Sequence, residues 1–137
     1  MYRHNTSFRI AWGDCDPAGI VFFPRYFALF NEATGALFES RGFPKPLLLK
    51  TYDIVGYPVV DIRATFKRAC TFGEDVTVES GVVEWGRSSF SLQHHLLKDG
   101  EFCVGCVEKR VWAARDAESA SGIRSKVIPD DIRAMLA

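Results

Sequence analysis

Apolar residues recur with two different periods along the chain, and the change of period separates the predicted elements. Between Ser7 and Trp12 large apolar residues occupy every second position, the pattern of a half-buried β-strand. From Phe22 they recur at three and four positions, which predicts a helix of about four turns from Pro24 to Arg41. The apolar positions of this helix are Phe23, Tyr26, Phe27, Phe30, Ala33, Leu37 and Phe38.

The period of two returns after Pro58 and continues through four further runs. They cover residues 60–66, 76–82, 90–96 and 102–114, and the pair Asp99-Gly100 between the last two predicts a hairpin turn. The segment from Gly42 to Pro58 and residues 117–125 are predicted as loops, and residues 129–136 as a short helix. No second helix is long enough to connect parallel strands, so we predict an α+β fold in which an antiparallel five-stranded sheet packs on one long helix.

Composition narrows the class of protein. The 137 residues suit one domain, residues 1–137, and 47% hydrophobic residues are enough for a sizeable core. The chain has 17 basic and 17 acidic side chains, so no net positive field favours nucleic-acid binding. No apolar run has the length of a membrane span and Met1–Ile10 lacks the apolar core of a signal peptide, so we expect a cytoplasmic protein whose four cysteines are free thiols.

The loop before the long helix carries the candidate chemistry. Asp14 and Asp16 stand just ahead of the helix N-terminus, where unpaired backbone N–H groups and the helix dipole stabilise negative charge. Pro24 has no N–H, so the useful donor is a neighbouring amide such as that of Phe23. Turn and capping roles are the ordinary explanation for two aspartates in such a loop, and that interpretation stays open at this point.

The residues around this loop resemble a known family. They match the 4-hydroxybenzoyl-CoA thioesterase family, whose members have the hot-dog fold, and are also similar to acyl-CoA thioesterases associated with the Tol-Pal system. The resemblance implies that the predicted sheet wraps around the long central helix. The matching segments are Gly13–Val21 with Pro24, Val55–Val60, Ala64–Phe66 and Glu84–Phe90.

The resemblance implies a role for individual residues. Asp16 matches the catalytic carboxylate, and the backbone amide of Phe23 matches the donor to the oxyanion. The implied substrate-binding residues are Gly19, Tyr26, Asn31, Arg87 and Ser88. Two of these depart from the family pattern: Arg87 is all that remains of a basic triplet, and Asn31 replaces the aspartate of the hydroxybenzoyl enzyme. Gly19 is also explained as a turn glycine, and Asn31 as a residue facing solvent or a partner subunit.

The expected function is hydrolysis of an aryl-CoA or a short- or medium-chain acyl-CoA. Asp16 would act as nucleophile or as general base, and the two roles are not distinguished by sequence. No cofactor is expected beyond the CoA of the substrate, and the resemblance implies a homodimer or homotetramer with the active site at the dimer interface. An alternative is a non-catalytic protein that binds acyl-CoA or acyl-carrier protein. A hydratase is disfavoured because all three histidines lie outside the loop.

Other reactive side chains are given structural roles. Cys103 and Cys106 have C-x-x-C spacing, but they lie in a predicted strand on opposite faces and lack further ligands, so no metal site is expected. The carboxylates on either side of Cys15 disfavour its thiolate. His94 and His95 are expected to face opposite ways, one into the core or an interface and the other to solvent.

Overall fold

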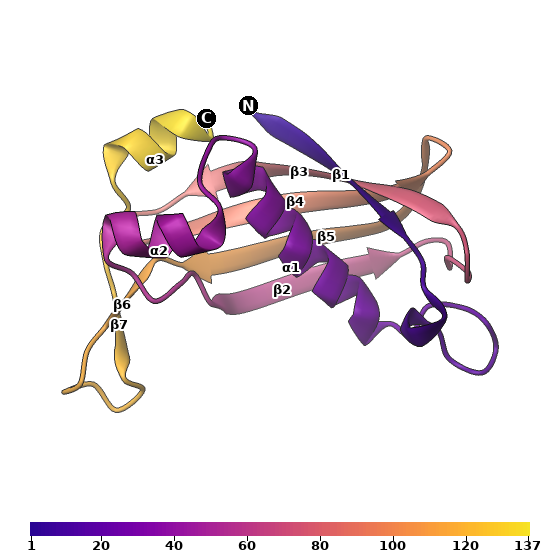
Figure 1. The fold of residues 1–137 in the computed structure, drawn as a ribbon, viewed down its shortest axis with the longest axis horizontal. Coiled ribbons are helices and arrows are strands. Elements are labelled where there is room, and N and C mark those ends of the chain that lie inside the picture. Colours follow the sequence, from indigo (N-terminus) through magenta and orange to yellow (C-terminus); the bar gives the residue numbers. More distant parts are fainter.

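One antiparallel sheet and one long helix dominate the fold (Figure 1). A computed structural model describes all 137 residues. The sheet has the order β1-β3-β4-β5-β2, and helix α1 (Pro24–Glu39) lies along its concave face. The strands are β1 (Arg3–Arg9), β2 (Val59–Phe66), β3 (Asp75–Trp85), β4 (Ser89–Lys98) and β5 (Glu101–Val111). The predicted α+β architecture is therefore confirmed.

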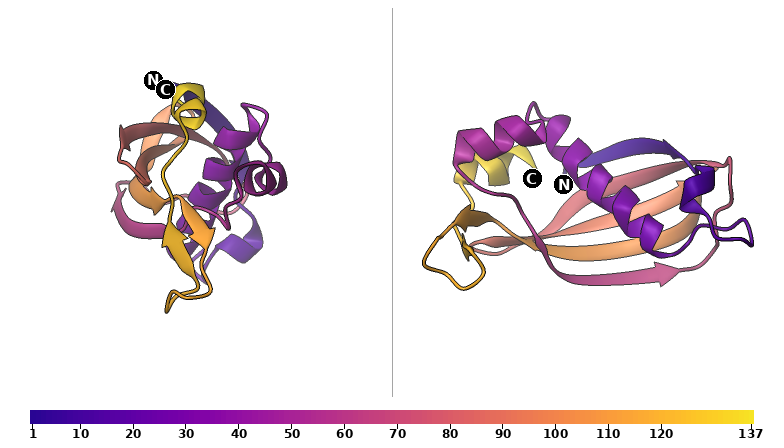
Figure 2. Two further views of the ribbon diagram at one scale, coloured as in Figure 1. Left: turned by 90° about the vertical axis from the view of Figure 1, so that its left-hand side faces the viewer. Right: turned by 60° about the horizontal axis from the view of Figure 1, so that its bottom comes forward.

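Helix α1 divides the core into two clusters along its length. Tyr26 and Phe30 in its first half pack with Val76 and Val104 of the sheet. Leu37 and Phe38 in its second half pack with residues from the far end of the sheet and from two short helices. The apolar residues of α1 are thus buried against the sheet along the helix, and also against the two short helices near its C-terminal end (Figure 2).

These added elements are α2 (Lys45–Tyr52) and α3 (Asp130–Met135). The short C-terminal helix was predicted, but α2 falls in the segment predicted as a loop, and that prediction is wrong. Two prolines start α2, because Pro44 is its N-cap and Pro46 occupies its first turn, where no N–H is needed. Leu48 of α2 is fully buried, so tertiary packing stabilises this short helix.

Three local predictions need correction. The first strand covers Arg3–Arg9, whereas Trp12 lies in a short 3-10 turn, η1 (Trp12–Asp14), because the pairing with β3 ends at Arg9. Residues 117–125 end in a strand, β7 (Ile123–Ser125), which pairs with β6 (Ala113–Arg115). Cys103 and Cys106 do not face opposite ways, because Cys103 is an extra residue in the ladder with β4 and both thiols enter the core.

Other predictions agree with the structure. Lys98 pairs with Glu101 across a two-residue turn in which Asp99 and Gly100 both have positive φ. All four cysteines are free, His94 is fully buried and His95 is partly exposed. No helix combines the length and apolar character that crossing a membrane requires.

Candidate active site

The loop before α1 is a tight, internally bonded turn at one end of the sheet (Figure 1). Cys15 and Val21 form a β-bridge, and the amide of Asp16 donates to the carbonyl of Ile20 at 2.9 Å. Gly19 has φ +83°, a conformation that L-residues with side chains rarely adopt, so the turn itself explains this glycine. Its carbonyl accepts the amide of Phe72 at 3.2 Å, which anchors the loop to the segment between β2 and β3.

The two aspartates of the loop have different environments. Asp14 is buried: its Oδ2 accepts the amide of Ala11 at 2.9 Å, and its Oδ1 accepts Nε and Nη2 of Arg25 at 3.1 and 2.9 Å. Asp16 is partly exposed, and only its Oδ1 is bonded, to the amide of Ala18 at 2.8 Å. Asp14 therefore has a capping role and Oδ1 of Asp16 has a turn role, but Oδ2 of Asp16 has no protein partner.

The backbone amide of Phe23 has no acceptor in the chain. Phe23 is the N-cap of α1, and the next two amides of the helix, those of Arg25 and Tyr26, donate to the carbonyls of Phe22 and Phe23. Pro24 has no N–H, so the amide of Phe23 is the unpaired donor at the positive end of the helix dipole. The carbonyl of Asp14 accepts the amide of Phe22 at 2.9 Å, which ties the loop directly to this end of the helix.

A cavity of about 290 Å³ opens beside Phe23. Its lining residues are Ile20, Val21, Phe23, Tyr26, Phe66, Lys67, Arg68 and Ala69. Tyr26 presents its ring to this cavity, but its hydroxyl accepts the amide of Cys70 at 3.0 Å, and burial raises the pKa of the phenol to about 12. Tyr26 therefore helps to shape the cavity, while its hydroxyl is hydrogen-bonded to the backbone of Cys70.

Arg87 and Ser88 lie far from this loop in the same chain. They belong to the turn between β3 and β4, whereas the loop adjoins the start of β3, so the length of that strand, about 30 Å, separates them. The guanidinium of Arg87 is exposed, and its carbonyl accepts the amide of Ile128 at 3.0 Å. A single chain therefore does not bring Arg87 to Asp16.

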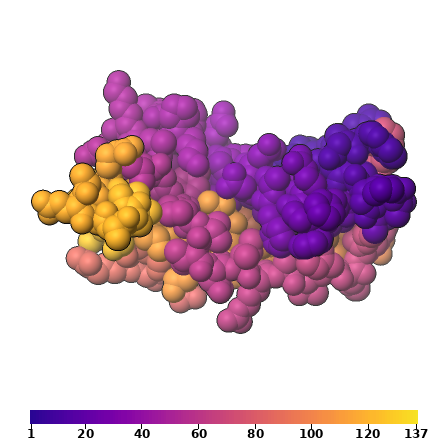
Figure 3. All heavy atoms as spheres, turned by 90° about the horizontal axis from the view of Figure 1, so that it is seen from below, coloured from indigo at the N-terminus to yellow at the C-terminus, as the bar shows by residue number.

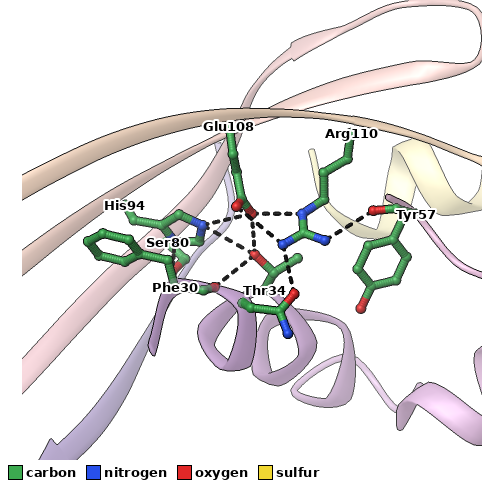
Figure 4. Close-up of polar contacts among 8 residues, drawn as sticks. Phe30, Thr34, Tyr57, Ser80, His94, Glu108 and Arg110 are labelled. Atoms are coloured by element: carbon green, nitrogen blue, oxygen red, sulfur yellow. Dashed lines mark hydrogen bonds and ion pairs between the residues drawn. The ribbon is translucent and has the colours of Figure 1, made fainter. Parts of the chain in front are cut away.

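A buried polar cluster, not predicted from the sequence, connects α1 to the sheet (Figure 4). Glu108 is its centre and accepts hydrogen bonds from Thr34 Oγ1 at 2.6 Å, His94 Nε2 at 3.1 Å and Arg110 Nε at 2.8 Å. Burial raises the pKa of the Glu108 carboxyl, but the hydrogen bonds from His94 and Arg110 and the Arg110 charge prevail and lower it to about 2. The cluster is thus a charged unit inside the core, in which Glu108 is hydrogen-bonded by three other side chains.

Arg110 extends this cluster to Asn31. Its Nη2 donates to Oδ1 of Asn31 at 3.0 Å, and its Nη1 donates to the carbonyl of Tyr57 at 3.0 Å. Asn31 is thereby placed two turns along α1 from Phe23 and held from the sheet side. The sequence contained a signal for this cluster, because Glu108 and Arg110 continue the inward parity of Val104 and Cys106 in β5.

Ser80, His94 and Glu108 follow one another in the order of a serine-hydrolase triad. Ser80 Oγ lies 2.7 Å from His94 Nδ1, on the side of the ring opposite Glu108. All three side chains are buried and none lines a cavity, so no substrate reaches Ser80. This array is a structural element of the core.

The model of the thioesterase-like superfamily matches residues 10–136. The chain belongs to the thioesterase-like superfamily. The predicted family and the class of thioester hydrolase are confirmed by this match and by individual relatives.

Several thioesterase-like proteins are similar over nearly their whole length. The chain is 33% identical to the 4-hydroxybenzoyl-CoA thioesterase of Pseudomonas sp. (strain CBS-3) over 129 residues, which cover 90% of this chain and 89% of that protein. A 4-hydroxybenzoyl CoA thioesterase in which one aspartate is replaced by asparagine, complexed with 4-hydroxybenzoyl CoA, has a TM-score of 0.88 at 29% identity, covering 98% and 99% of the two chains. A gentisyl-coenzyme A thioesterase has a TM-score of 0.82 at 32% identity, covering 97% and 98%. The hot-dog fold is therefore confirmed.

Proposed function

We propose that this thioesterase-like protein hydrolyses acyl-CoA thioesters at the loop before α1. The observation that carries the proposal is that two groups form no hydrogen bond within the chain: Oδ2 of Asp16 and the backbone amide of Phe23. Thioester hydrolysis requires a nucleophile or base and a donor for the oxygen that gains charge. These two groups supply both requirements from one loop and the adjoining helix end.

Two roles for Asp16 fit this arrangement. As nucleophile, its Oδ2 attacks the thioester carbonyl carbon, the C–S bond breaks with release of the CoA thiolate, and water then hydrolyses the mixed anhydride. As general base, Asp16 takes a proton from the water that attacks the same carbon. In both routes the carbonyl oxygen becomes negative and accepts the amide of Phe23, an interaction typically worth about 3 to 4 kcal/mol in the transition state.

The acyl group we propose is aryl, with short or medium acyl chains as the comparison class. The relatives named above act on 4-hydroxybenzoyl-CoA and gentisyl-CoA, and the cavity beside the Phe23 amide has three aromatic residues, Phe23, Tyr26 and Phe66, in its lining. Such rings pack against a planar acyl group in edge-to-face or offset geometry. The CoA of the substrate is the only cofactor-like group in this scheme.

A second copy of the chain completes the site in this proposal. Strand β2 is an edge of the sheet, and most of it is exposed, including Val60 (57%), Ile62 (39%) and Phe66 (48%). A long apolar edge strand with unpaired backbone groups is a ready template for pairing with another chain. A homodimer joined along β2 covers this edge, and the exposed Arg87 and Ser88 then serve a CoA bound at the active site of a neighbouring subunit.

The variant Asp16→Asn tests the catalytic assignment. We expect its turnover of 4-hydroxybenzoyl-CoA, benzoyl-CoA and hexanoyl-CoA to fall by about 10² to 10⁴ with an unchanged fold. Asp116→Asn is the matched control, because Asp116 Oδ1 accepts the amide of Glu118 at 3.0 Å in the same two-residue arrangement, in a loop elsewhere. Equal rates for the wild type and Asp16→Asn on every thioester would show that Asp16 is not catalytic.

The alternative of a non-catalytic binding protein gives a different result. It predicts that the wild type binds these acyl-CoAs, measured by calorimetry, without releasing free CoA. The burial of Ser80 and the lack of a histidine in the loop support Asp16 as the group on which turnover depends in our proposal.

A further inference from the structure

The buried polar cluster ends at a second cavity, of about 400 Å³. Its lining residues are Asn31, Lys45, Val55, Gly56, Tyr57, Pro58, Val59, Arg110 and Ile123. Two of these, Lys45 and Arg110, are cationic, and no aspartate or glutamate is among them. The lining of the cavity therefore combines cationic and apolar side chains and contains no acidic one.

Arg110 is held rigidly at the floor of this cavity. It is buried, and four hydrogen bonds fix its guanidinium: two to the carboxylate of Glu108, one to Asn31 and one to the carbonyl of Tyr57. A guanidinium has five N–H donors, so one N–H of Nη1 has no partner. The position of this donor is fixed by the core, which gives it directional selectivity.

Two further hydrogen-bond donors at the cavity, the side-chain nitrogens of Asn31 and Lys45, also have no acceptor in the chain. Because a guanidinium only donates, Asn31 must turn its oxygen toward Arg110, and its amide nitrogen has no acceptor in the chain. Lys45 forms no ion pair and lies 4.8 Å from the centre of the Tyr57 ring. Since Glu108 neutralises Arg110, the unpaired charge at the cavity is the positive charge of Lys45.

This cavity has residues of α1 and β2 in its lining, as does the cavity beside the Phe23 amide. The cavity beside the Phe23 amide has Phe66, from the end of β2, in its lining, whereas the second cavity has Asn31 and Val59, from the start of β2. Seen from below, α1 and β2 share one face of the molecule, and atoms from the end of β5 show between them (Figure 3). Asn31 is about 12 Å of helical rise beyond Phe23. An aryl acyl group with a hydrogen bond at each end spans a comparable length.

We propose that Lys45, Arg110 and Asn31 form a subsite for an anionic oxygen group at the far end of the acyl moiety, a carboxylate above all. This inference rests on the proposed thioesterase function and adds the substrate class: acyl-CoAs whose acyl group carries a second carboxylate. A phosphate of CoA has the same chemistry. The acyl source is favoured because the pantetheine arm places the phosphates much farther from the thioester than two helical turns.

The first test compares a matched pair of thioesters. We expect the wild type to have a kcat/KM for 4-carboxybenzoyl-CoA at least about tenfold above that for 4-methylbenzoyl-CoA, since hydrogen bonds to charged groups are strong. Lys45→Gln should lower this ratio about tenfold, and Asn31→Asp should lower it further by adding a negative charge. Lys50→Gln is the control, because Lys50 is an exposed lysine of α2 outside the cavity lining and should leave the ratio unchanged.

A second experiment distinguishes an acyl carboxylate from a CoA phosphate as the anion that the cavity binds. The same acyl groups are offered as pantetheine thioesters, which lack the nucleotide phosphates. If the carboxylate preference persists on pantetheine and depends on Lys45, the acyl subsite is supported. If Lys45→Gln weakens both CoA thioesters equally and has no effect on either pantetheine thioester, the cavity holds a phosphate and the proposal is wrong.

Binding separates this inference from the proposed function. Thioether analogues of the two CoA substrates cannot be hydrolysed, and calorimetry should give about tenfold tighter binding of the carboxylated one to the wild type. Equal affinities would overturn the subsite even if the protein is an active thioesterase. Tighter binding of the carboxylated analogue that is lost in Lys45→Gln would support the subsite even if no thioester is turned over.

Discussion

Replacing Glu108 with glutamine tests how the buried polar cluster stabilises the fold. The substitution keeps the shape of the side chain but removes the charge that neutralises Arg110 inside the core. The pKa of Glu108 is lowered to about 2 from an ordinary value of 4.5, and each pKa unit corresponds to about 1.4 kcal/mol. The ionised carboxylate therefore contributes about 3 kcal/mol to the free energy of unfolding at pH 7, in line with the cost of breaking a buried ion pair.

The sign of the pH dependence follows from the lowered pKa. The contribution is complete above pH 4.5, because the carboxyl is then ionised in both the folded and the unfolded chain, and it is lost as the pH falls toward 2. The difference between the wild type and Glu108→Gln should thus be about 3 kcal/mol at pH 7 and about 1 kcal/mol at pH 3. At low pH the protonated wild type and the variant both leave Arg110 without its counter-ion.

Urea unfolding followed by tryptophan fluorescence measures this difference. It is carried out at several pH values and at one protein concentration, since subunit association shifts apparent stability. Glu118→Gln is the control, because Glu118 is exposed and its carboxylate has no ion pair in the structure. A cost below about 1 kcal/mol at pH 7, or a cost that does not change with pH, would refute the electrostatic account.

Three further predictions follow from other parts of the structure. Tyr26→Phe leaves the buried amide of Cys70 without an acceptor and should lower the free energy of unfolding by about 1 to 3 kcal/mol, measured in urea. Ile62→Lys places a charge on the exposed β2 edge and should convert the proposed homodimer to monomer in sedimentation velocity; a wild-type monomer at the same concentration would contradict the β2 interface. At pH 8 a maleimide should label Cys15 before any other cysteine of the folded protein. Desolvation and the charges of Asp14 and Asp16 raise the pKa of the Cys15 thiol and slow its reaction, but burial removes the other thiols from solvent and raises the pKa of Cys106 to about 12; faster labelling of Cys106 than of Cys15 would contradict this.

The sequence alone determined most of the local elements and the residue types that the loop presents. Alternation with a period of two and a period near 3.6 fixes strands and a long helix wherever one face of an element is buried, and this is true of α1 and of four of the five sheet strands. The Asp99-Gly100 turn was predictable because only a few residue pairs accept two positive φ angles. The match of Gly13–Val21 to a thioesterase family likewise rests on contiguous residues, which require no folding to compare.

Tertiary structure decided which of the candidate groups are free to act. In the sequence Asp14 and Asp16 are equivalent candidates. In the structure, Arg25 and the amide of Ala11 bind Asp14, whereas one carboxylate oxygen of Asp16 has no partner. Helix α2 exists because Leu48 reaches the core, a contact that its flanking prolines do not reveal.

The buried cluster illustrates the same limit most clearly. Glu108 and Arg110 are a charged pair at inward positions of β5. Thr34, His94 and Asn31, from other elements, stabilise this pair in the core by hydrogen bonds. Their sequence separations from Glu108 and Arg110 reach 79 residues, so no local pattern records the contacts. The reason is physical: the free energy of a buried charge is set by the atoms around it in space, and those atoms come together only when the chain has folded.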